Sequence, residues 1–279
     1  MLIAHISDLH IRPVGEFAAR ILDTNMLAER ALRAVASFRP APDCVVVSGD
    51  VTECGRVAEY QVAARLLTRL LPMPVFVVPG NHDRRDNFRA GLADLPGVSA
   101  DPTFVQYVVD DFPVRLVMLD SVVPGAGYGE LCSKRLAFLE NALAAAPARP
   151  TLLVLHHPPL MTGVPGMDVI PLRDTPALAE IIARHPQVLG VLAGHHHRAI
   201  VAPLHRASVC VAPATVGHQS ELCFDAATPA FFTLEPCAYW LHRWTPEDGL
   251  VSHLAFVENY PGPYPFLVDA DYPGYTPKA

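Results

Sequence analysis

Apolar and polar positions along the first hundred residues predict strands and helices in turn. Short apolar runs rich in valine and isoleucine are typical of buried strands. Between them lie longer segments in which apolar residues recur every three or four positions, the spacing of one helix face. The expected strands cover residues 2–7, 43–49 and 74–78, and the expected helices cover residues 20–38, 56–71 and 84–94. This order predicts a βαβαβα unit.

The pattern changes from residue 103 onward. Two neighbouring apolar runs, 104–112 and 115–121, are separated by a turn at Pro113, which predicts an antiparallel pair. The expected elements that follow are helices at 133–146 and 176–184 and strands at 151–155, 187–193, 199–204 and 208–213. Two βα halves that face one another would account for this layout.

The character shifts again at about residue 222, so we expect a catalytic domain over 1–221 and a C-terminal extension over 222–279. The extension holds two apolar runs, at 238–244 and 250–257, and then a tail rich in proline, tyrosine and glycine. The prolines exclude a helix in this tail. It is expected to lie on its own domain, as a strap or lid, to be a frayed end, or to pack on another subunit and form a homo-oligomer.

Composition narrows the class of protein. The chain has 279 residues, 51% of them hydrophobic, which is enough for a large core. The formal charge is −7 without a run of lysine or arginine, which disfavours a nucleic-acid polymer as partner. No apolar stretch approaches a membrane span, so we expect a cytoplasmic protein. The six cysteines form no C-x-x-C pair and are expected to be reduced, with a bridge among the last three left open.

Residues that bind metal ions recur directly after the predicted strands. Because side chains two positions apart leave a strand end on the same side, Asp8 and His10 can share one ion, and His195 and His197 are expected to leave their strand on one side. A carboxylate such as Asp50 has two oxygens that can bridge two cations. The expected metal-binding residues at these strand ends are Asp8, His10, Asp50, Asn81, His195 and His197, and the pair His156-His157 follows another predicted strand. In Gly80-Asn81-His82-Asp83, we expect His82 to be a proton donor and Asp83 its orienting partner.

These blocks resemble the calcineurin-like metallophosphoesterase family, in the order D-x-H, G-D, G-N-H-D, H-H-P-P and G-H-x-H. The resemblance implies a four-layer αββα sandwich of two mixed sheets flanked by helices. It also implies two metal sites that share Asp50, one with Asp8, His10 and His197 and the other with Asn81, His156 and His195. Within the family, AHISDLH, VVVSGDVTECGR, PGNHD and HHPPL resemble bacterial glycerophosphodiesterases and class III cyclic nucleotide phosphodiesterases.

Several further residues are expected to contact the substrate or to be structural. His157, His196 and His218 lie beside or after the ligand blocks and could contact substrate, support a ligand or lie on the surface. Glu53 and Arg56 could steer the polar end of a substrate, although charged residues after a strand are usually solvated. The histidines interpreted as structural are His5, His185, His205, His242 and His253.

The function expected from these residues is hydrolysis of a small phosphodiester, such as a cyclic nucleotide or a glycerophosphodiester, by a hydroxide that bridges two metal ions. The ions would be divalent or trivalent Fe, Zn, Mn or Co, all of which accept oxygen and nitrogen ligands of this type. One alternative is a monoesterase or protein phosphatase, which would hold a dianion with Arg12, Arg84, Arg85 or Arg198. A second is a non-catalytic scaffold with the same fold, which the intact ligand set disfavours.

Overall fold

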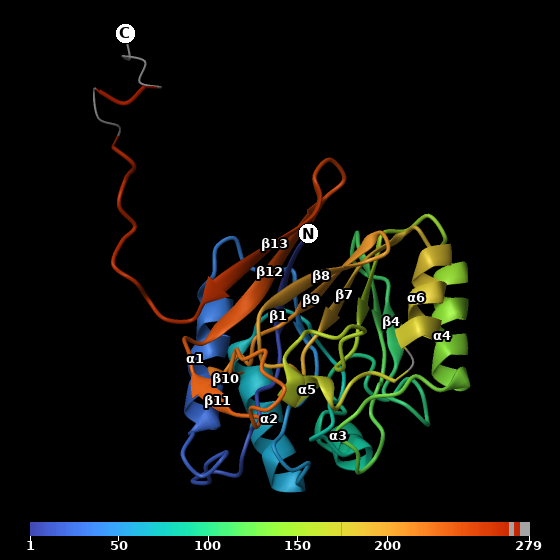
Figure 1. The fold of residues 1–279 in the computed structure, drawn as a ribbon, viewed down its shortest axis with the longest axis horizontal. Helices are drawn as coiled ribbons and strands as arrows, with labels where there is room; N and C mark the ends of the chain where they lie inside the picture. Colours follow the sequence, from blue (N-terminus) through green and yellow to red (C-terminus); the bar gives the residue numbers. More distant parts are fainter. Residues whose placement is uncertain (174, 268–270, 274–279) are drawn as a thin grey trace.

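The chain folds into two facing β-sheets covered by helices on both outer sides (Figure 1). The structure is a computed structural model, and it describes all residues except 174, 268–270 and 274–279. Helices α1 and α2 pack on one sheet, and α4 and α6 pack on the other. The arrangement is the expected α/β sandwich of four layers.

The first sheet has the strand order β13-β12-β1-β2-β3. Its strands are β1 (Leu2–Ile6), β2 (Cys44–Val47), β3 (Val75–Val77), β12 (Ala238–Thr245) and β13 (Gly249–Phe256). The first three strands run parallel, whereas β12 and β13 are antiparallel to their neighbours. The connecting helices are α1 (Thr24–Ser37), α2 (Val57–Leu70) and α3 (Arg85–Gly91). The predicted βαβαβα unit is therefore present.

Helix α1 begins four residues later than the apolar pattern predicted. Ala19 and Arg20 have φ angles of 46° and 67°, which are incompatible with a right-handed helix. The helix starts after Asp23, whose carboxylate accepts a hydrogen bond from the Met26 amide at 3.0 Å and so caps the first turn.

The second sheet has the strand order β4-β5-β6-β7-β9-β8. Its strands are β4 (Tyr107–Val109), β5 (Arg115–Met118), β6 (Thr151–Val154), β7 (Val188–Ala193), β8 (Ile200–Leu204) and β9 (Ala207–Val211). The expected antiparallel pair is β4 and β5, and β5, β6, β7 and β9 run parallel. Helices α4 (Ser133–Ala144) and α6 (Thr175–Arg184) cover its outer face, and a short helix, α5 (Pro165–Asp168), was not predicted.

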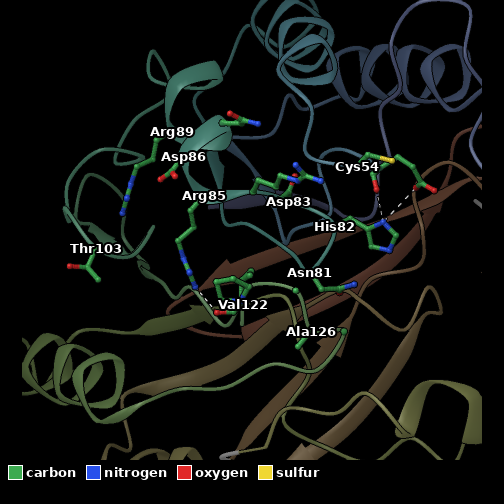
Figure 2. A pocket seen from close by; sticks show the side chains of 16 residues that line it. Cys54, Asn81, His82, Asp83, Arg85, Asp86, Arg89, Thr103, Val122 and Ala126 are labelled. Carbon is green, nitrogen blue, oxygen red and sulfur yellow. Dashed lines mark hydrogen bonds and ion pairs between the residues drawn. The ribbon is translucent and has the colours of Figure 1, made fainter.

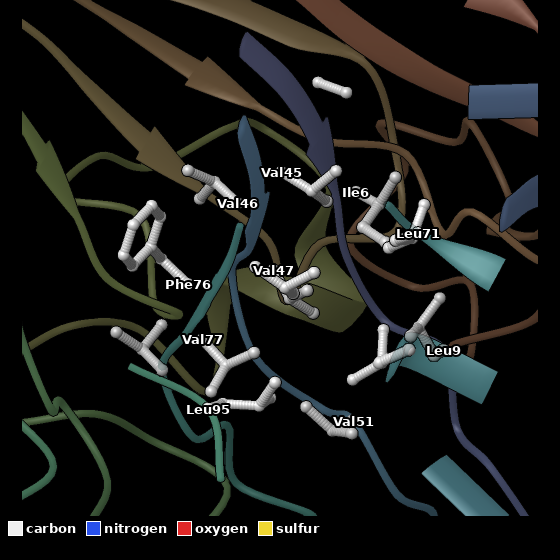
Figure 3. Close-up of a cluster of buried hydrophobic side chains, with 14 of the residues drawn as sticks. Ile6, Leu9, Val45, Val46, Val47, Val51, Leu71, Phe76, Val77 and Leu95 are labelled. Carbon is white, nitrogen blue, oxygen red and sulfur yellow. The ribbon is translucent and has the colours of Figure 1, made fainter. Parts of the chain in front are cut away.

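Strand alternation divides the buried side chains into two cores. Leu116, Met118, Leu152 and Val154 belong to the larger core, which also contains the valines of β2 and β3 and apolar residues of α1 and α2 (Figure 3). The intervening residues of the same strands belong to the core beneath α4 and α6. Because side chains of a strand point to opposite faces in turn, one buried sheet contributes to both cores.

Two strands of the predicted C-terminal extension belong to the first sheet. Strand β12 pairs with β1, with Ala4 opposite Leu241, and β13 forms the outer edge. Before them, β10 (His218–Ser220) and β11 (Phe232–Leu234) form a two-stranded sheet that was not predicted. The separation of the residues from 222 onward as a unit stays a prediction.

The described part of the tail has neither helix nor strand and leaves the body of the molecule (Figure 1). Its side chains are exposed, Tyr264 at 76% and Phe266 at 103%. The remainder of the predicted tail lies outside the described residues.

The cysteines and the lengths of the helices are two further features of the described chain. All six cysteines are free thiols, as their spacing predicted. No helix within the described ranges has the length and apolar character needed to cross a membrane.

A buried tyrosine joins the edges of the two sheets. The Tyr107 hydroxyl on β4 accepts a hydrogen bond from the Val77 amide and donates one to the Val77 carbonyl, both at 2.9 Å. Val77 lies on the edge strand β3, so its outward backbone groups would otherwise be buried without a partner. This side chain completes the edge and fixes the sheets relative to one another.

We expect Tyr107→Phe to lower the free energy of unfolding by about 2–4 kcal/mol, because two buried backbone groups lose their partner. Urea denaturation measures this change. The matched control is Tyr239→Phe, which removes a hydroxyl that forms no hydrogen bond among the described residues. Equal effects of the two substitutions would contradict the proposed bridge.

Candidate metal centre

The expected metal ligands follow five strands that end at the same edge of the two sheets. Two hydrogen bonds join the loops of opposite sheets at this edge. His156 Nδ1, after β6, donates to the Ser48 carbonyl at 2.8 Å, and the His195 amide, after β7, donates to the Asp8 carboxylate at 3.2 Å. The convergence predicted from strand ends is therefore present.

Backbone strain is concentrated at the same positions. Five non-glycine residues of the predicted ligand set have positive φ angles: Asp8 at 55°, His10 at 45°, Asp50 at 45°, His195 at 70° and His197 at 50°. Such conformations cost about 1–3 kcal/mol each and persist where the surroundings hold them, commonly at functional sites. The strained turns bring these side chains into one place.

One cluster consists of Asp8, His10, Asp50 and His197, each with a ligand atom within 4.8 Å of the others. His197 Nε2 lies 3.3 Å from Asp8 Oδ1, and His10 Nε2 lies 3.7 Å from Asp50 Oδ2. The two Nε2 atoms are 3.2 Å apart. All four side chains are buried or nearly so.

In His10 and His197, the hydrogen bonds of the outer nitrogens (Nδ1) determine whether the inner nitrogens (Nε2) carry a hydrogen. His10 Nδ1 donates to the Glu53 carboxylate at 2.6 Å, and His197 Nδ1 donates to the His218 carbonyl at 3.0 Å. A neutral imidazole carries one hydrogen, so each inner Nε2 then has a lone pair. Burial lowers the pKa of His10, which favours the neutral ring. Lone pairs and carboxylate oxygens thus face one another, and a cation would satisfy them together.

In a second cluster, which includes His156, Asn81 and Asp50, an imidazole nitrogen again faces oxygen atoms. His156 Nδ1 donates to Ser48, which leaves Nε2 at 3.0 Å from Asn81 Oδ1 and at 3.3 Å from Asp50 Oδ2. Burial lowers the pKa of His156, but the Asp50 carboxylate outweighs it and raises the pKa to about 9. Positive charge is therefore favoured between His156 and Asp50, where a proton or a metal ion can supply it. Asp50 contacts both clusters, as a bridging carboxylate would.

His195 is the second histidine of this cluster. Its Nε2 donates to the Ile170 carbonyl at 2.9 Å, which leaves the Nδ1 lone pair for a metal. The His195 ring centroid lies 5.0 Å from that of His156, and burial holds the pKa of His195 well below its ordinary value. A neutral ring of fixed tautomer is the form in which histidine binds metals.

His82 stands at the open side of the centre. Its side chain is 38% exposed, its amide donates to Asp50 Oδ1 at 2.8 Å, and Nδ1 donates to the Glu53 carbonyl at 2.7 Å. Burial lowers the pKa of His82, but Asp50 and the Glu53 carbonyl together outweigh it, so the pKa is raised. Because Nδ1 is already a donor, Nε2 carries a hydrogen only when the ring is protonated.

The predicted pairing of Asp83 with His82 is wrong, because the Asp83 carboxylate is used elsewhere. Its two oxygens accept hydrogen bonds at 2.8–3.1 Å from groups of Val51, Thr52, Tyr60 and Gly80. Burial and the Asp50 carboxylate raise the pKa of Asp83 to about 6. Asp83 thus ties the loop after β2 to the loop after β3, while a backbone carbonyl orients His82.

Glu53 was expected at most to steer the substrate, yet it contacts the centre directly. Through its carboxylate it holds His10, and through its carbonyl it holds His82. A carboxylate behind a metal-bound imidazole fixes the ring and raises its basicity. Arg56, the other residue considered for substrate steering, is exposed and forms an ion pair with Glu16 at 3.3 Å.

His157 lies beneath the centre, fully buried. Its ring contacts the Ser121 hydroxyl at 2.8 Å and donates to the Gly127 carbonyl at 3.1 Å, so both nitrogens are used. Burial lowers the pKa of His157 to about 3. These contacts hold the loop around Gly127, and a Cβ on Gly129 would lie 2.4 Å from the ring.

His196 and His218 differ in their relation to the centre. His196 is buried, and neither of its ring nitrogens has a hydrogen-bond partner among the described residues. His218 packs against the first cluster, with its ring centroid 4.3 Å from that of His197 and 4.8 Å from that of His10. Burial lowers the pKa of His218.

A cavity of about 880 Å³ opens beside the centre (Figure 2). Its wall includes Asn81 and His82 from the loop after β3, and Val122 and Gly127 from the loop held by His157. The size is that of a small-molecule site. A group bound here would meet the exposed ring of His82.

Comparison with known proteins agrees with this geometry. A family model described as calcineurin-like phosphoesterase matches residues 1–199. The probable glycerophosphodiester phosphodiesterase GpdQ of Arcobacter nitrofigilis is 33% identical over 267 residues, which are 95% of this chain and 97% of that protein. The 3',5'-cyclic adenosine monophosphate phosphodiesterase CpdA of Escherichia coli strain K12 is 30% identical over 237 residues, 84% of each chain.

A solved structure gives the same fold at much lower identity. A dimetal phosphatase from Danio rerio superposes with a TM-score of 0.63 at 16% identity, over 92% of this chain and 99% of that one. The extent of the family match and the identity to curated relatives settle the classification. The chain belongs to the calcineurin-like phosphoesterase family.

Proposed function

We propose that the chain is a metal-dependent phosphodiesterase that hydrolyses small phosphodiesters at the centre described above. The observation that carries the proposal is the convergence of imidazole nitrogens and carboxylate oxygens around Asp50. Such a donor set suits two cations of intermediate hardness, such as Fe, Zn, Mn or Co. Relatives with names of two phosphodiesterase classes support the same reaction.

The proposed ligands divide into two sets that share Asp50. Asp8, His10 and His197 complete the first, and Asn81, His156 and His195 complete the second. Bound cations would acidify water, orient the phosphoryl group and neutralise its developing charge. The protein contributes the fixed tautomers, because a carbonyl or carboxylate holds the outer nitrogen of each imidazole.

His82 is proposed to donate a hydrogen bond or a proton from Nε2. Its exposed ring faces the cavity, and the Glu53 carbonyl fixes the opposite nitrogen. The neighbouring Asp50 carboxylate favours the protonated ring, in which Nε2 is a donor. That donor can stabilise a phosphoryl oxygen or protonate the departing alkoxide.

The arginines near the centre favour a diester over the monoester alternative. A phosphomonoester dianion needs free positive charge, but most of these guanidinium groups are already paired. Arg12 pairs with Glu59, Arg85 with Asp120, and Arg198 with Glu235. Arg84 is exposed and has no ion pair among the described residues. The scaffold alternative leaves the strained, acceptor-rich centre unexplained.

The C-terminal tail exposes several large apolar and aromatic side chains. We infer that the tail supports a homo-oligomer, because Tyr264, Phe266 and Leu267 expose 76%, 103% and 88% of their surface. Aromatic side chains of this kind are typical of interfaces.

A cytoplasmic location is supported by the six free thiols, since the cytoplasm keeps cysteines reduced.

We expect Asp50→Ala to lose both metal ions, because each proposed ligand set contains this carboxylate. In contrast, His82→Ala should retain them and lower kcat by about 100-fold or more, because it removes a donor that acts on the reacting group. Elemental analysis and hydrolysis of bis(p-nitrophenyl) phosphate measure the two effects.

The matched control is His253→Ala, which removes an exposed histidine from β13 and should change neither quantity. Full turnover by His82→Ala would remove that residue from the mechanism.

Glu53→Gln is expected to weaken metal binding by about tenfold, since a neutral amide supports His10 less strongly than a carboxylate does. Competition with a chelator of known affinity measures the change. Arg56→Gln alters a charged residue on the same loop whose guanidinium pairs only with Glu16 among the described residues, and should leave affinity unchanged. Unchanged affinity in Glu53→Gln would show that this contact has no supporting role.

Deletion of the residues after 258 should reduce the oligomer to a smaller species, because it removes the exposed aromatic side chains of the tail. Light scattering of the full and shortened chains at equal concentration tests this. The proposed role would be refuted if the full-length chain is monomeric, or if the shortened chain forms particles with the same number of subunits as the full-length chain.

A further inference from the structure

The cavity beside the metal centre continues well beyond the reacting group. In the view of Figure 2, Asn81 and His82 lie at one end, Arg89 and Thr103 lie at the other, and the Arg85 side chain lies between them. The volume of about 880 Å³ leaves room for an ester group of the substrate next to a phosphoryl group at the metals. The wall of this cavity is therefore where one ester group of a diester would be recognised.

Arg85 is held rigidly on one edge of its guanidinium group. Nε and Nη2 donate to the two oxygens of Asp120 at 2.6 and 3.0 Å, and Nη2 also donates to the Val122 carbonyl. Asp120 is fully buried, and the guanidinium carbon lies 5.4 Å from the centre of the Phe104 ring. A planar guanidinium clamped in this way has a fixed direction for its remaining donors.

The other edge of Arg85 is free. Nη1 forms no hydrogen bond with any residue that the structure describes, and the side chain is 16% exposed at the cavity wall. An unused donor of fixed direction, on the wall of a cavity next to a reaction centre, is suited to positioning a ligand oxygen.

The charge of Arg85 indicates which oxygen this would be. Asp120 neutralises the guanidinium, so the pair adds no net positive charge for a second anion, whereas its N–H groups can still donate to a hydroxyl. The described wall of the cavity contains no phenylalanine, tyrosine or tryptophan. It therefore lacks the aromatic surface on which a nucleobase commonly stacks.

We propose that Arg85 determines specificity by donating a hydrogen bond from Nη1 to a hydroxyl of the substrate, whose ester group is a hydroxylated alkyl chain such as that of glycerol. This inference rests on the proposed phosphodiesterase function. Asp120 fixes the guanidinium, and His157 supports the facing loop through Gly127. The metal centre acts on the phosphoryl group, and Arg85 selects what is attached to it.

The test compares two symmetrical diesters, bis(dihydroxypropyl) phosphate and dipropyl phosphate, with monoester formation followed by phosphorus NMR. The ratio of their kcat/KM values measures recognition of the hydroxyls. Any unfolded fraction of the protein cancels from this ratio, because both substrates are assayed with the same preparation. The unaltered protein should prefer the hydroxylated diester. Arg85→Met should lower the ratio by about tenfold, the effect of one lost hydrogen bond.

Two further variants separate geometry from charge. Arg85→Lys keeps the charge but not the forked geometry, and should also lower the ratio. Arg84→Met removes an exposed guanidinium from the same cavity wall, and should keep the ratio within about twofold. Any one of three results would overturn the proposal: a preference of the unaltered protein for dipropyl phosphate, an unchanged ratio in Arg85→Met, or a decrease of the ratio in Arg84→Met equal to that in Arg85→Met.

Hydrolysis of bis(p-nitrophenyl) phosphate by the unaltered, metal-loaded protein is measured in parallel. If it is absent, the proposed function fails. If it is present while the ratio does not respond to Arg85, only the assignment of Arg85 fails.

Discussion

The structure depends on one electrostatic constraint: hydrogen-bond acceptors face one another at the ends of the central strands. Nε2 atoms of His10 and His197 lie 3.2 Å apart, and Nε2 of His156 lies between Asn81 and Asp50 oxygens. Acceptors in a buried site repel unless positive charge lies among them. The raised pKa of His156 shows the same demand, since a proton takes up the role that a cation would otherwise have.

The surrounding residues hold this unfavourable arrangement in place. The carbonyl oxygens of Ser48, Ile170 and His218 each accept the outer hydrogen of one imidazole, and Glu53 does so for His10. Asp83 joins two of the ligand-bearing loops through backbone amides. The positive φ angles at the ligand positions are tolerated because these contacts, together with the two cores beneath, over-determine the local conformation. Rigidity of this kind fixes cations and substrate relative to one another.

Much of the fold could be predicted because the strands are short, β-branched and followed by chemically distinctive residues. That pattern located β1, β2, β3, β6 and β7 and the polar residues after them. The sequence pattern could not predict the side-chain contacts that depend on loop conformation. Asp83 looked like a partner of His82 because the two are adjacent in sequence, yet the turn sends them in different directions.

Long-range pairing was equally hidden from the sequence. Backbone carbonyls such as that of Ile170 carry no residue-type signal, so their role appears only when the loops are in place. The position of β12 beside β1 joins residues more than two hundred positions apart, which local periodicity does not reveal. The pairing of Arg85 with Asp120 has the same character, because α3 and the loop after β5 meet only in the folded chain.

The most direct test of the central claim is to remove metal with a chelator and then restore it stepwise. Bound metal and hydrolysis of bis(p-nitrophenyl) phosphate are measured at each step. The account predicts no hydrolysis without metal, and recovery that is complete at about two ions per chain, the capacity of two ligand sets that share one carboxylate. Hydrolysis that persists unchanged in metal-free protein would contradict it.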